Sequence, residues 1–149
     1  MAIAYFSTWT TYGTWLPGDE RGWYERVVGL REPDPILKQR AQLLMTEDAL
    51  ALDATQRQIV EGVIAEHCRI KNWTLHAVNC RSNHVHVAVS ADEVPITRPR
   101  EQFKMWGSRR LQGTMPDRVY WWTRRGWDVY VDDNQHLAAV VRYIVEGQD

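Results

Sequence analysis

The 149-residue sequence predicts a single α+β domain, residues 1–149, with an antiparallel sheet of four to five strands and helices mainly on one face. Two observations predict this class. Strand-like and helix-like segments follow one another in the order β-α-β-β-α-β(β)-α, and the β-α-β-β-α-β part is the ferredoxin-like split arrangement. The composition, 44% hydrophobic and 25% charged, is ordinary for a globular protein, and no internal repeat or linker divides the chain.

The first half of the chain is predicted to hold one strand, a long irregular region and one helix. Residues 5–12, YFSTWTTY, are rich in aromatic and β-branched side chains and favour a strand. Glycine and proline interrupt residues 13–38, so we expect no regular structure there. Helical signals begin near Thr46, and Asp53 and Gln56 form a capping-box pattern before an amphipathic helix.

The second half begins with a hairpin. Residues 73–82 and 84–90 both favour strands, and the connection between them is short enough to require an antiparallel pair. A helix fits residues 100–111. Residues 119–131, VYWWTRRGWDVYV, are predicted to form a second hairpin with Gly126 near its tip.

The chain is predicted to end in a helix that carries a tyrosine at the edge of its apolar stripe. Asp133 or Asn134 can cap this helix, and Gly147 is expected to end it. The stripe consists of Leu137, Val140, Val141 and Ile144. Tyr143 lies about 60° from the centre of the stripe at 100° per residue. Its hydroxyl can act as a nucleophile near a charged centre, or its ring can simply pack on the sheet.

Two histidines flank one valine in the stretch Asn83–Ser90, NHVHVAVS. In a strand, positions i and i+2 share one face, so His84 and His86 are expected to project side by side. Two adjacent imidazoles are a ligand arrangement for a metal ion. The alternative is a pair of polar residues on the solvated face of a half-buried strand.

Positive charge is concentrated in one segment although the net charge of the chain is only −1. Residues 97–127 carry eight basic side chains against two acidic ones, a local net charge of +6. The basic residues are Arg98, Arg100, Lys104, Arg109, Arg110, Arg118, Arg124 and Arg125. This asymmetry indicates a side that faces a polyanion, or else a solvated charged surface.

Several classes of protein are disfavoured. No run approaches the roughly 20 apolar residues of a membrane span, and the first residues lack the basic start and apolar core of a signal peptide. The only cysteines, Cys68 and Cys80, have no CxxC spacing and are too few for a disulfide scaffold. We therefore expect a cytoplasmic protein with reduced thiols and no membrane partner.

Together these features resemble the single-tyrosine HUH transposases, the small insertion-sequence transposases and the REP-associated tyrosine transposases. The segments that carry the resemblance are SNHVHVAVS and VVRYIVEGQD, with STWTTYGTWLPGDERGW as weaker support. The resemblance spans nearly the whole chain, in element order as well as in motif.

The resemblance implies a metal-dependent enzyme that cleaves and rejoins single-stranded DNA. His84 and His86 would bind Mg²⁺ or Mn²⁺, and Tyr143 would attack a phosphodiester to give a 5′-phosphotyrosine and a free 3′-hydroxyl. The family usually places a Gln or Asn ligand four residues after the tyrosine, where this chain has Gly147. Gln148 is the favoured third ligand, and Glu146 is the alternative.

The expected partner is single-stranded or hairpin DNA. Its phosphates would contact a set of basic side chains, namely Arg98, Arg100, Lys104, Arg109, Arg110, Arg124 and Arg125. Trp121, Trp122 and Trp127 are candidates for stacking on bases or for core packing, and Asn83 orients His84 or only forms the turn. In some relatives the tyrosine helix of one subunit completes the histidine site of another, so a homodimer is also compatible with the resemblance.

Other functions compete with this interpretation. A catalytically weak or inactive nucleic-acid-binding protein with the same fold is the first alternative, because Gly147 replaces a ligand. A cupin-like metalloenzyme also uses His-x-His on a strand, but it requires a Glu soon after the second histidine and many more strands. A two-histidine phosphoesterase would need a second His-x-Ser/Thr motif, and the chain has none.

Overall fold

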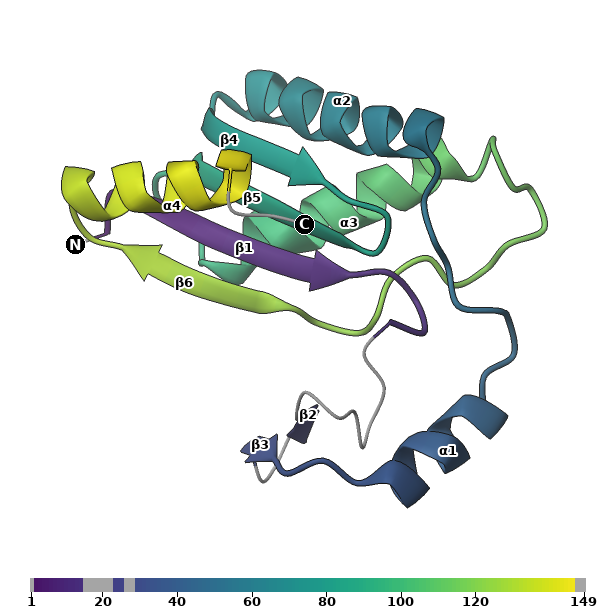
Figure 1. Cartoon of the computed structure of the whole chain (residues 1–149). Coiled ribbons are helices and arrows are strands. Elements are labelled where there is room, and N and C mark those ends of the chain that lie inside the picture. The colour runs from purple at the N-terminus through teal and green to yellow at the C-terminus, as the bar shows by residue number, and fades with distance from the viewer. Residues whose placement is uncertain (1, 15–22, 26–28, 147–149) are drawn as a thin grey trace.

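A computed structural model describes residues 2–14, 23–25 and 29–146 (Figure 1). Its main sheet has the strand order β4-β5-β1-β6, and every neighbouring pair is antiparallel. The strands are β1 (Ala4–Thr10), β4 (Thr74–Cys80), β5 (His84–Ser90) and β6 (Trp127–Val131). With a helix after β1 and another after β5, this is the ferredoxin-like split arrangement that the sequence predicts.

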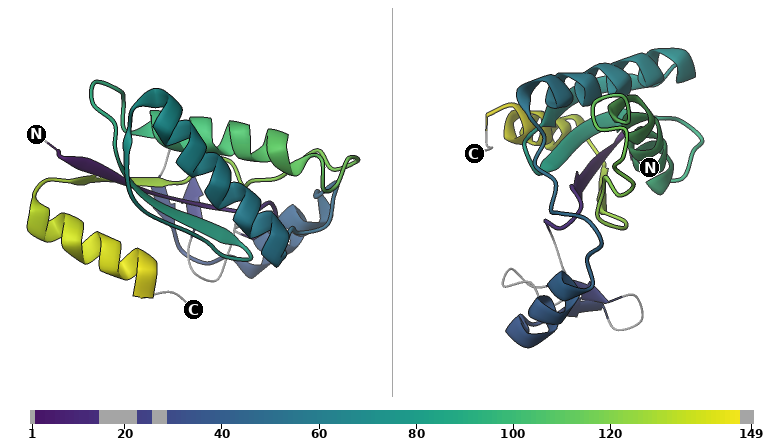
Figure 2. Two further views of the ribbon diagram at one scale, coloured as in Figure 1. Left: turned by 90° about the horizontal axis from the view of Figure 1, so that it is seen from above. Right: turned by 90° about the vertical axis from the view of Figure 1, so that its right-hand side faces the viewer.

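Three helices pack on this sheet, two on one face and one on the other (Figure 2). Helices α2 (Ala54–Lys71) and α3 (Thr97–Leu111) contact each other and cover the first face. Helix α4 (Asn134–Glu146) contacts β4 and β5 from the opposite face. The prediction of helices mainly on one face is therefore confirmed, and the final helix is the one on the other side.

Alternation along the strands explains why both faces of the sheet are covered. Val85, Val87 and Val89 of β5 are fully buried in the cluster that includes α2 and α3. Ala88, which lies between them in sequence, belongs to a separate cluster with Val140 and Ile144 of α4. The two clusters bury both faces of β5, which makes it an interior strand of the domain.

Helix α2 begins where the capping box predicts. The Asp53 side chain accepts a hydrogen bond from the backbone N–H of Gln56, and the Gln56 side chain accepts one from the backbone N–H of Asp53. The helix ends at Asn72, whose φ of 63° is left-handed. The expected helical start near Thr46 is wrong, because the chain is irregular between there and Asp53.

The region expected to be irregular contains short elements. β2 (Trp23–Glu25) and β3 (Gly29–Arg31) form a two-stranded sheet, and α1 (Pro35–Leu43) follows them. The prediction of no regular structure is therefore wrong at 23–25, at 29–31 and from 35 onward. Asp34 caps α1 by accepting from the backbone N–H of Leu37, and Pro35 occupies the first turn, where a missing N–H costs nothing.

The predicted hairpin at 119–131 is also wrong, because only β6 is a strand. Instead of folding back on itself, the segment before β6 runs beside the end of β1. Tyr12 N–H donates to the Trp121 carbonyl, and Thr123 N–H donates to the Thr10 carbonyl. Gly126 marks close contact with β1, since a Cβ there would lie 2.5 Å from the Thr8 carbonyl oxygen.

A buried ion pair attaches β6 to α3. Arg100 donates from Nε and Nη2 to the Asp128 carboxylate at 2.9–3.1 Å, and only 8% of Arg100 is exposed. The same carboxylate accepts from Ser7 Oγ at 2.8 Å. The expectation that Arg100 contacts DNA phosphates is therefore corrected, because its guanidinium is committed to the fold.

Lys104 also holds the segment before β6 in place. Its ammonium group donates to the carbonyls of Thr123 and Arg125 at 2.9 and 2.8 Å. Burial, reinforced by the nearby charge of Arg100, lowers the pKa of Lys104 from 10.5 to about 8. Lys104 is thus a structural residue of this loop, contrary to its predicted role in phosphate binding.

Replacement of Arg100 by Met should destabilise the protein, because the buried Asp128 carboxylate loses its ion-pair partner. We expect the free energy of unfolding to fall by about 3–5 kcal/mol in denaturant titrations. Arg98→Met, at an exposed position on the same helix, is the control and should change it by no more than about 0.5 kcal/mol. Equal effects of the two substitutions would contradict the structural role of Arg100.

The pKa of Lys104 predicts a pH dependence of stability. The unfolded chain holds this proton up to about pH 10.5 and the folded chain only up to about pH 8, so the contribution of Lys104 to stability rises between these values. We expect the difference in free energy of unfolding between wild type and Lys104→Met to move in favour of the wild type across this window. A difference that stays constant from pH 7 to 10.5 would show that the ammonium is not desolvated.

Candidate active site

The two histidines of β5 project from the α4 side of the sheet. Their ring centroids are 4.8 Å apart, and only 6% of His86 is exposed. The intervening Val85 is fully buried in the cluster on the opposite face. The prediction that His84 and His86 lie side by side on one face of the strand is therefore confirmed.

Each imidazole is held through its Nδ1 atom. His84 Nδ1 lies 2.8 Å from Asn83 Oδ1, and an amide oxygen can only accept, so Nδ1–H donates to it. His86 Nδ1 lies 2.7 Å from Thr8 Oγ1. The lone pair of His84 is therefore on Nε2, the tautomer that metal-binding histidines adopt when a neighbour accepts their other N–H. The Thr8 hydroxyl can accept from His86 Nδ1–H, and in that tautomer the lone pair of His86 is on Nε2 as well. The expectation that Asn83 orients His84 agrees with this contact.

Thr8 is a site residue that the sequence did not reveal. It lies directly opposite His86 in the pairing of β1 with β5, at a separation of 78 residues. Residues directly opposite each other in an antiparallel pair have their side chains on the same face. Only the register of the two strands could have identified Thr8, and that register is a property of the fold.

Helix α4 places Tyr143 beside the histidines of the same chain. The Tyr143 ring centroid is 5.5 Å from that of His86 and 6.1 Å from that of Phe6. Asn79 of β4, which pairs with His86 in the sheet, donates from its side chain to the Ile144 carbonyl at 2.8 Å. That bond ties the last turn of α4 to the sheet one residue from Tyr143, and 48% of the tyrosine remains exposed.

Between α4 and β6 lies a groove of about 540 Å³ that includes both His86 and Tyr143. Its other lining residues are Phe6, Thr8, Trp127, Val129, His136, Ala139 and Val140. We call this the α4–β6 groove. His136 is a second residue that the sequence analysis missed. It lies seven positions before Tyr143, so helical periodicity alone could have placed the two on one face.

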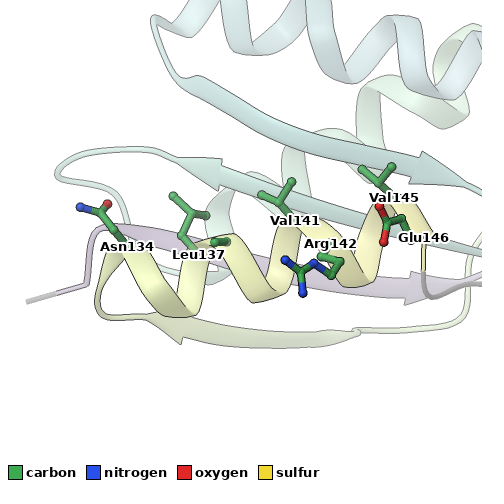
Figure 3. Close-up of a pocket in the computed structure, with 7 residues that line it drawn as sticks. Asn134, Leu137, Val141, Arg142, Val145 and Glu146 are labelled. Atoms are coloured by element: carbon green, nitrogen blue, oxygen red, sulfur yellow. The ribbon is translucent and has the colours of Figure 1, made fainter.

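The third metal ligand is not defined by the described residues. Gln148 and Gly147, which were predicted to complete the site and to end the helix, lie outside them. Glu146, the alternative ligand, lines a different pocket on α4 together with Leu137, Val141 and Val145 (Figure 3). Within 2–14, 23–25 and 29–146, no three His, Cys, Asp or Glu side chains are grouped to hold a metal ion. The choice between Gln148 and Glu146 as third ligand therefore stays a prediction.

The exposed basic side chains of the predicted surface lie on two segments, helix α3 and the loop before β6. Arg98, Arg109 and Arg110 are exposed on α3, which covers the face opposite the histidines. Arg109 lies over the Trp106 ring at 4.8 Å, and Arg110 pairs with Glu66 at 3.8 Å. By contrast, the exposed Arg124 and Arg125 lie in the loop three and two positions before Trp127, which lines the α4–β6 groove.

The three tryptophans that were candidates for base stacking differ in burial and in position. Trp121 is 3% exposed and donates from its indole N–H to Gln112 Oε1. Trp122 donates to the Lys104 carbonyl and packs against the core cluster. Trp127 is 42% exposed and lines the groove. Trp121 and Trp122 are thus packing residues, and Trp127 is the candidate that lies beside the site.

The cysteines take no part in this site. Both are free and buried, and burial raises the pKa of Cys68 to about 11 and that of Cys80 to about 12. The thiols are therefore protonated near neutral pH and are poor nucleophiles or metal ligands. Among the helices of the described segments, none combines the length and apolar character that crossing a membrane requires.

Comparison with known proteins identifies the family of this chain. The family model described as "Transposase IS200 like" matches residues 36–147. A solved structure of a REP-associated tyrosine transposase bound to a REP hairpin superposes with a TM-score of 0.56 at 15% sequence identity, over 97% of this chain. This chain spans 66% of the length of that protein.

A candidate transposase from Deinococcus radiodurans R1 superposes with a TM-score of 0.55 at 14% identity, over 97% of this chain and 89% of that one. At such identities the two structures show a shared fold. No curated protein sequence matches the chain. The family model, in contrast, covers well over half of the 149 residues, including both histidines and Tyr143. The chain therefore belongs to the family of IS200-like transposases.

Proposed function

We propose that this protein cleaves and rejoins single-stranded DNA through a phosphotyrosine intermediate formed on Tyr143. The observation that carries the proposal is the position of the Tyr143 ring, 5.5 Å from His86, which is itself 4.8 Å from His84. A candidate nucleophile and a candidate metal-binding pair thus converge from α4 and β5 of one chain. Their convergence needs no second subunit.

In the proposed reaction the Tyr143 oxygen attacks the scissile phosphorus. A bond forms between phosphorus and the phenolic oxygen, the bond to the 3′-oxygen breaks, and the phenolic proton leaves while the 3′-oxygen gains a proton. The products are a 5′-phosphotyrosine and a free 3′-hydroxyl. Because the new bond is also a phosphodiester, a later 3′-hydroxyl can reverse the step and rejoin strands.

The residues of the site fit a divalent cation, Mg²⁺ or Mn²⁺. His84 and His86 would hold it through Nε2, since their Nδ1 atoms contact Asn83 and Thr8. Gln148 would add an amide oxygen, which is a ligand that such hard cations accept. When bound, the cation would offset the negative charge of the phosphate that repels the nucleophile and stabilise the charge that develops in the transition state.

DNA is the proposed partner for two reasons. The family is one of transposases, and the structural neighbour with a TM-score of 0.56 is described as bound to a REP hairpin. In this chain, exposed Arg124 and Arg125 precede Trp127, which lines the same groove as Tyr143. We propose that these two arginines contact the phosphates of the strand that enters the site, in place of the α3 cations on the far face.

Tyr143→Phe should abolish covalent adduct formation while it leaves folding and DNA binding intact, because only one oxygen is lost. The assay is denaturing electrophoresis of labelled single-stranded DNA from the flanks of the gene, with Mn²⁺ present. Tyr130→Phe is the matched control, at a tyrosine that is 56% exposed on β6, and should form adduct at the wild-type rate. An adduct that persists in Tyr143→Phe would reassign the nucleophile. No adduct from the wild type would favour a DNA-binding protein without cleavage.

Thr8→Val should weaken metal binding, because it removes the hydroxyl that contacts His86 Nδ1 while it preserves the shape of the side chain. We expect the Mn²⁺ concentration for half-maximal adduct formation, and the Kd for Mn²⁺ measured by calorimetry, to rise about 10- to 100-fold. Thr10→Val is the control, since Thr10 faces His84 in the same strand pair and its hydroxyl has no partner among the described residues. Equal effects of both variants would exclude a positioning role for Thr8.

A further inference from the structure

We propose that the α4–β6 groove holds one nucleobase of the DNA strand, that of a nucleotide adjoining the scissile phosphate. This inference rests on the proposed function, because it assigns a place to the substrate beside Tyr143. It adds a base-binding subsite with Trp127 as the stacking residue and His136 as the residue that contacts the edge of the base.

The groove is continuous with the site of chemistry. His86 and Tyr143 line it, so a phosphate between the metal-binding pair and the tyrosine lies at its boundary. The nucleotides on either side of that phosphate are covalently joined to it, so the base of one of them can reach the groove. At about 540 Å³ the groove falls within the range of small-molecule sites, which is enough for a base but not for a duplex.

The lining suits the flat faces of a base. Phe6, Val129, Ala139 and Val140 supply apolar contact from three elements: β1, β6 and α4. Trp127 contributes an indole that is 42% exposed. Stacking of a base on an aromatic side chain contributes about 1–3 kcal/mol and is tolerant of sequence, because every base has an aromatic face. An indole on one wall, with Ala139 and Val140 on the α4 wall, is therefore a fitting slot for one base.

His136 supplies a polar contact that could distinguish one base from another. It is half-buried on α4 and lines the groove seven positions before Tyr143. A neutral imidazole offers both a donor and an acceptor, which matches the donors and acceptors on the edge of a base. The other hydrogen-bonding side chains of the lining besides Trp127 are Thr8, His86 and Tyr143, which are assigned to the metal site and to nucleophilic attack.

Charge beside the groove favours a nucleic acid as its occupant. Arg124 and Arg125 are exposed three and two positions before Trp127, so a base against the indole would bring its backbone phosphates toward two cations. Among the described residues, no acidic side chain lines the groove. An apolar slot with cations at its border and a candidate nucleophile in its wall is complementary to one nucleotide of a single strand.

The test is a double-mutant cycle between Trp127 and the DNA. An abasic nucleotide is moved one position at a time along the labelled strand from the gene's flank, and the rate of adduct formation is measured for wild type and Trp127→Ala. We expect one of the two positions adjoining the scissile phosphate to lower the wild-type rate by about 5- to 100-fold. In Trp127→Ala the intact strand should already be slow, and the abasic change should have little further effect.

Trp106→Ala is the matched control, because Trp106 has nearly the same exposure, 41% against 42%, but lies on α3 across the sheet. It should retain the full abasic penalty. A penalty of the same size in Trp127→Ala as in the wild type, or no penalty at either adjoining position, would overturn the inference. The same cycle is also measured in the Tyr143→Phe background, as the Kd for DNA in place of the rate of adduct formation. Binding needs no adduct, so this measurement tests the base-binding groove even if Tyr143 is not the nucleophile.

A second measurement tests His136. All four bases are placed in turn at the position that couples to Trp127, and the rates are compared for wild type and His136→Leu. We expect the wild type to prefer one base or one pair of bases and the variant to lose that preference while it keeps the dependence on Trp127. An unchanged order and spread of the four rates would show that His136 does not contact the base.

Discussion

The candidate site depends on the register of β5 between two packed layers. Val85, Val87 and Val89 are fully buried against α2 and α3, so the intervening His86 and the preceding His84 must face α4. A slip of one residue would move both imidazoles into the apolar core against α2 and α3 and turn the valines toward α4. That cost is large, because an unpaired polar group in an apolar interior loses its hydrogen bonds to water. Core packing therefore keeps the two imidazoles together on the α4 side.

Two structural devices on opposite faces of the sheet complete the site around that strand. On one face, the bond from Asn79 to the Ile144 carbonyl holds the last turn of α4 above β5, with Tyr143 next to it. On the other face, the buried pair of Arg100 and Asp128 holds β6 against α3. Since α4 and β6 form the walls of the groove, residues remote from the chemistry set its width. Loss of either attachment should change substrate binding by altering the width of the groove, although neither pair of residues contacts the substrate.

Local patterns predicted the elements best where one strong signal decided them. The capping box at Asp53 located a helix, and the alternation of β5 located the histidine pair. The residues that sequence reasoning misassigned or missed are those whose partners are distant along the chain. Arg100 was assigned to a basic patch because no local sequence pattern pairs it with Asp128, which lies 28 residues later in the chain. Thr8 reaches His86 across 78 residues, through strand pairing that no local pattern encodes.

The most direct test of the central claim is to identify the amino acid that carries the DNA. Trypsin cuts after Arg118, Arg124, Arg125 and Arg142, so three candidate tyrosines fall on different peptides: Tyr120 on 119–124, Tyr130 on 126–142 and Tyr143 on 143–149. After reaction with single-stranded DNA, nuclease digestion and mass spectrometry, the nucleotide mass should be found on the peptide 143–149. A nucleotide mass on either of the other two peptides would contradict the assignment of Tyr143 as the nucleophile.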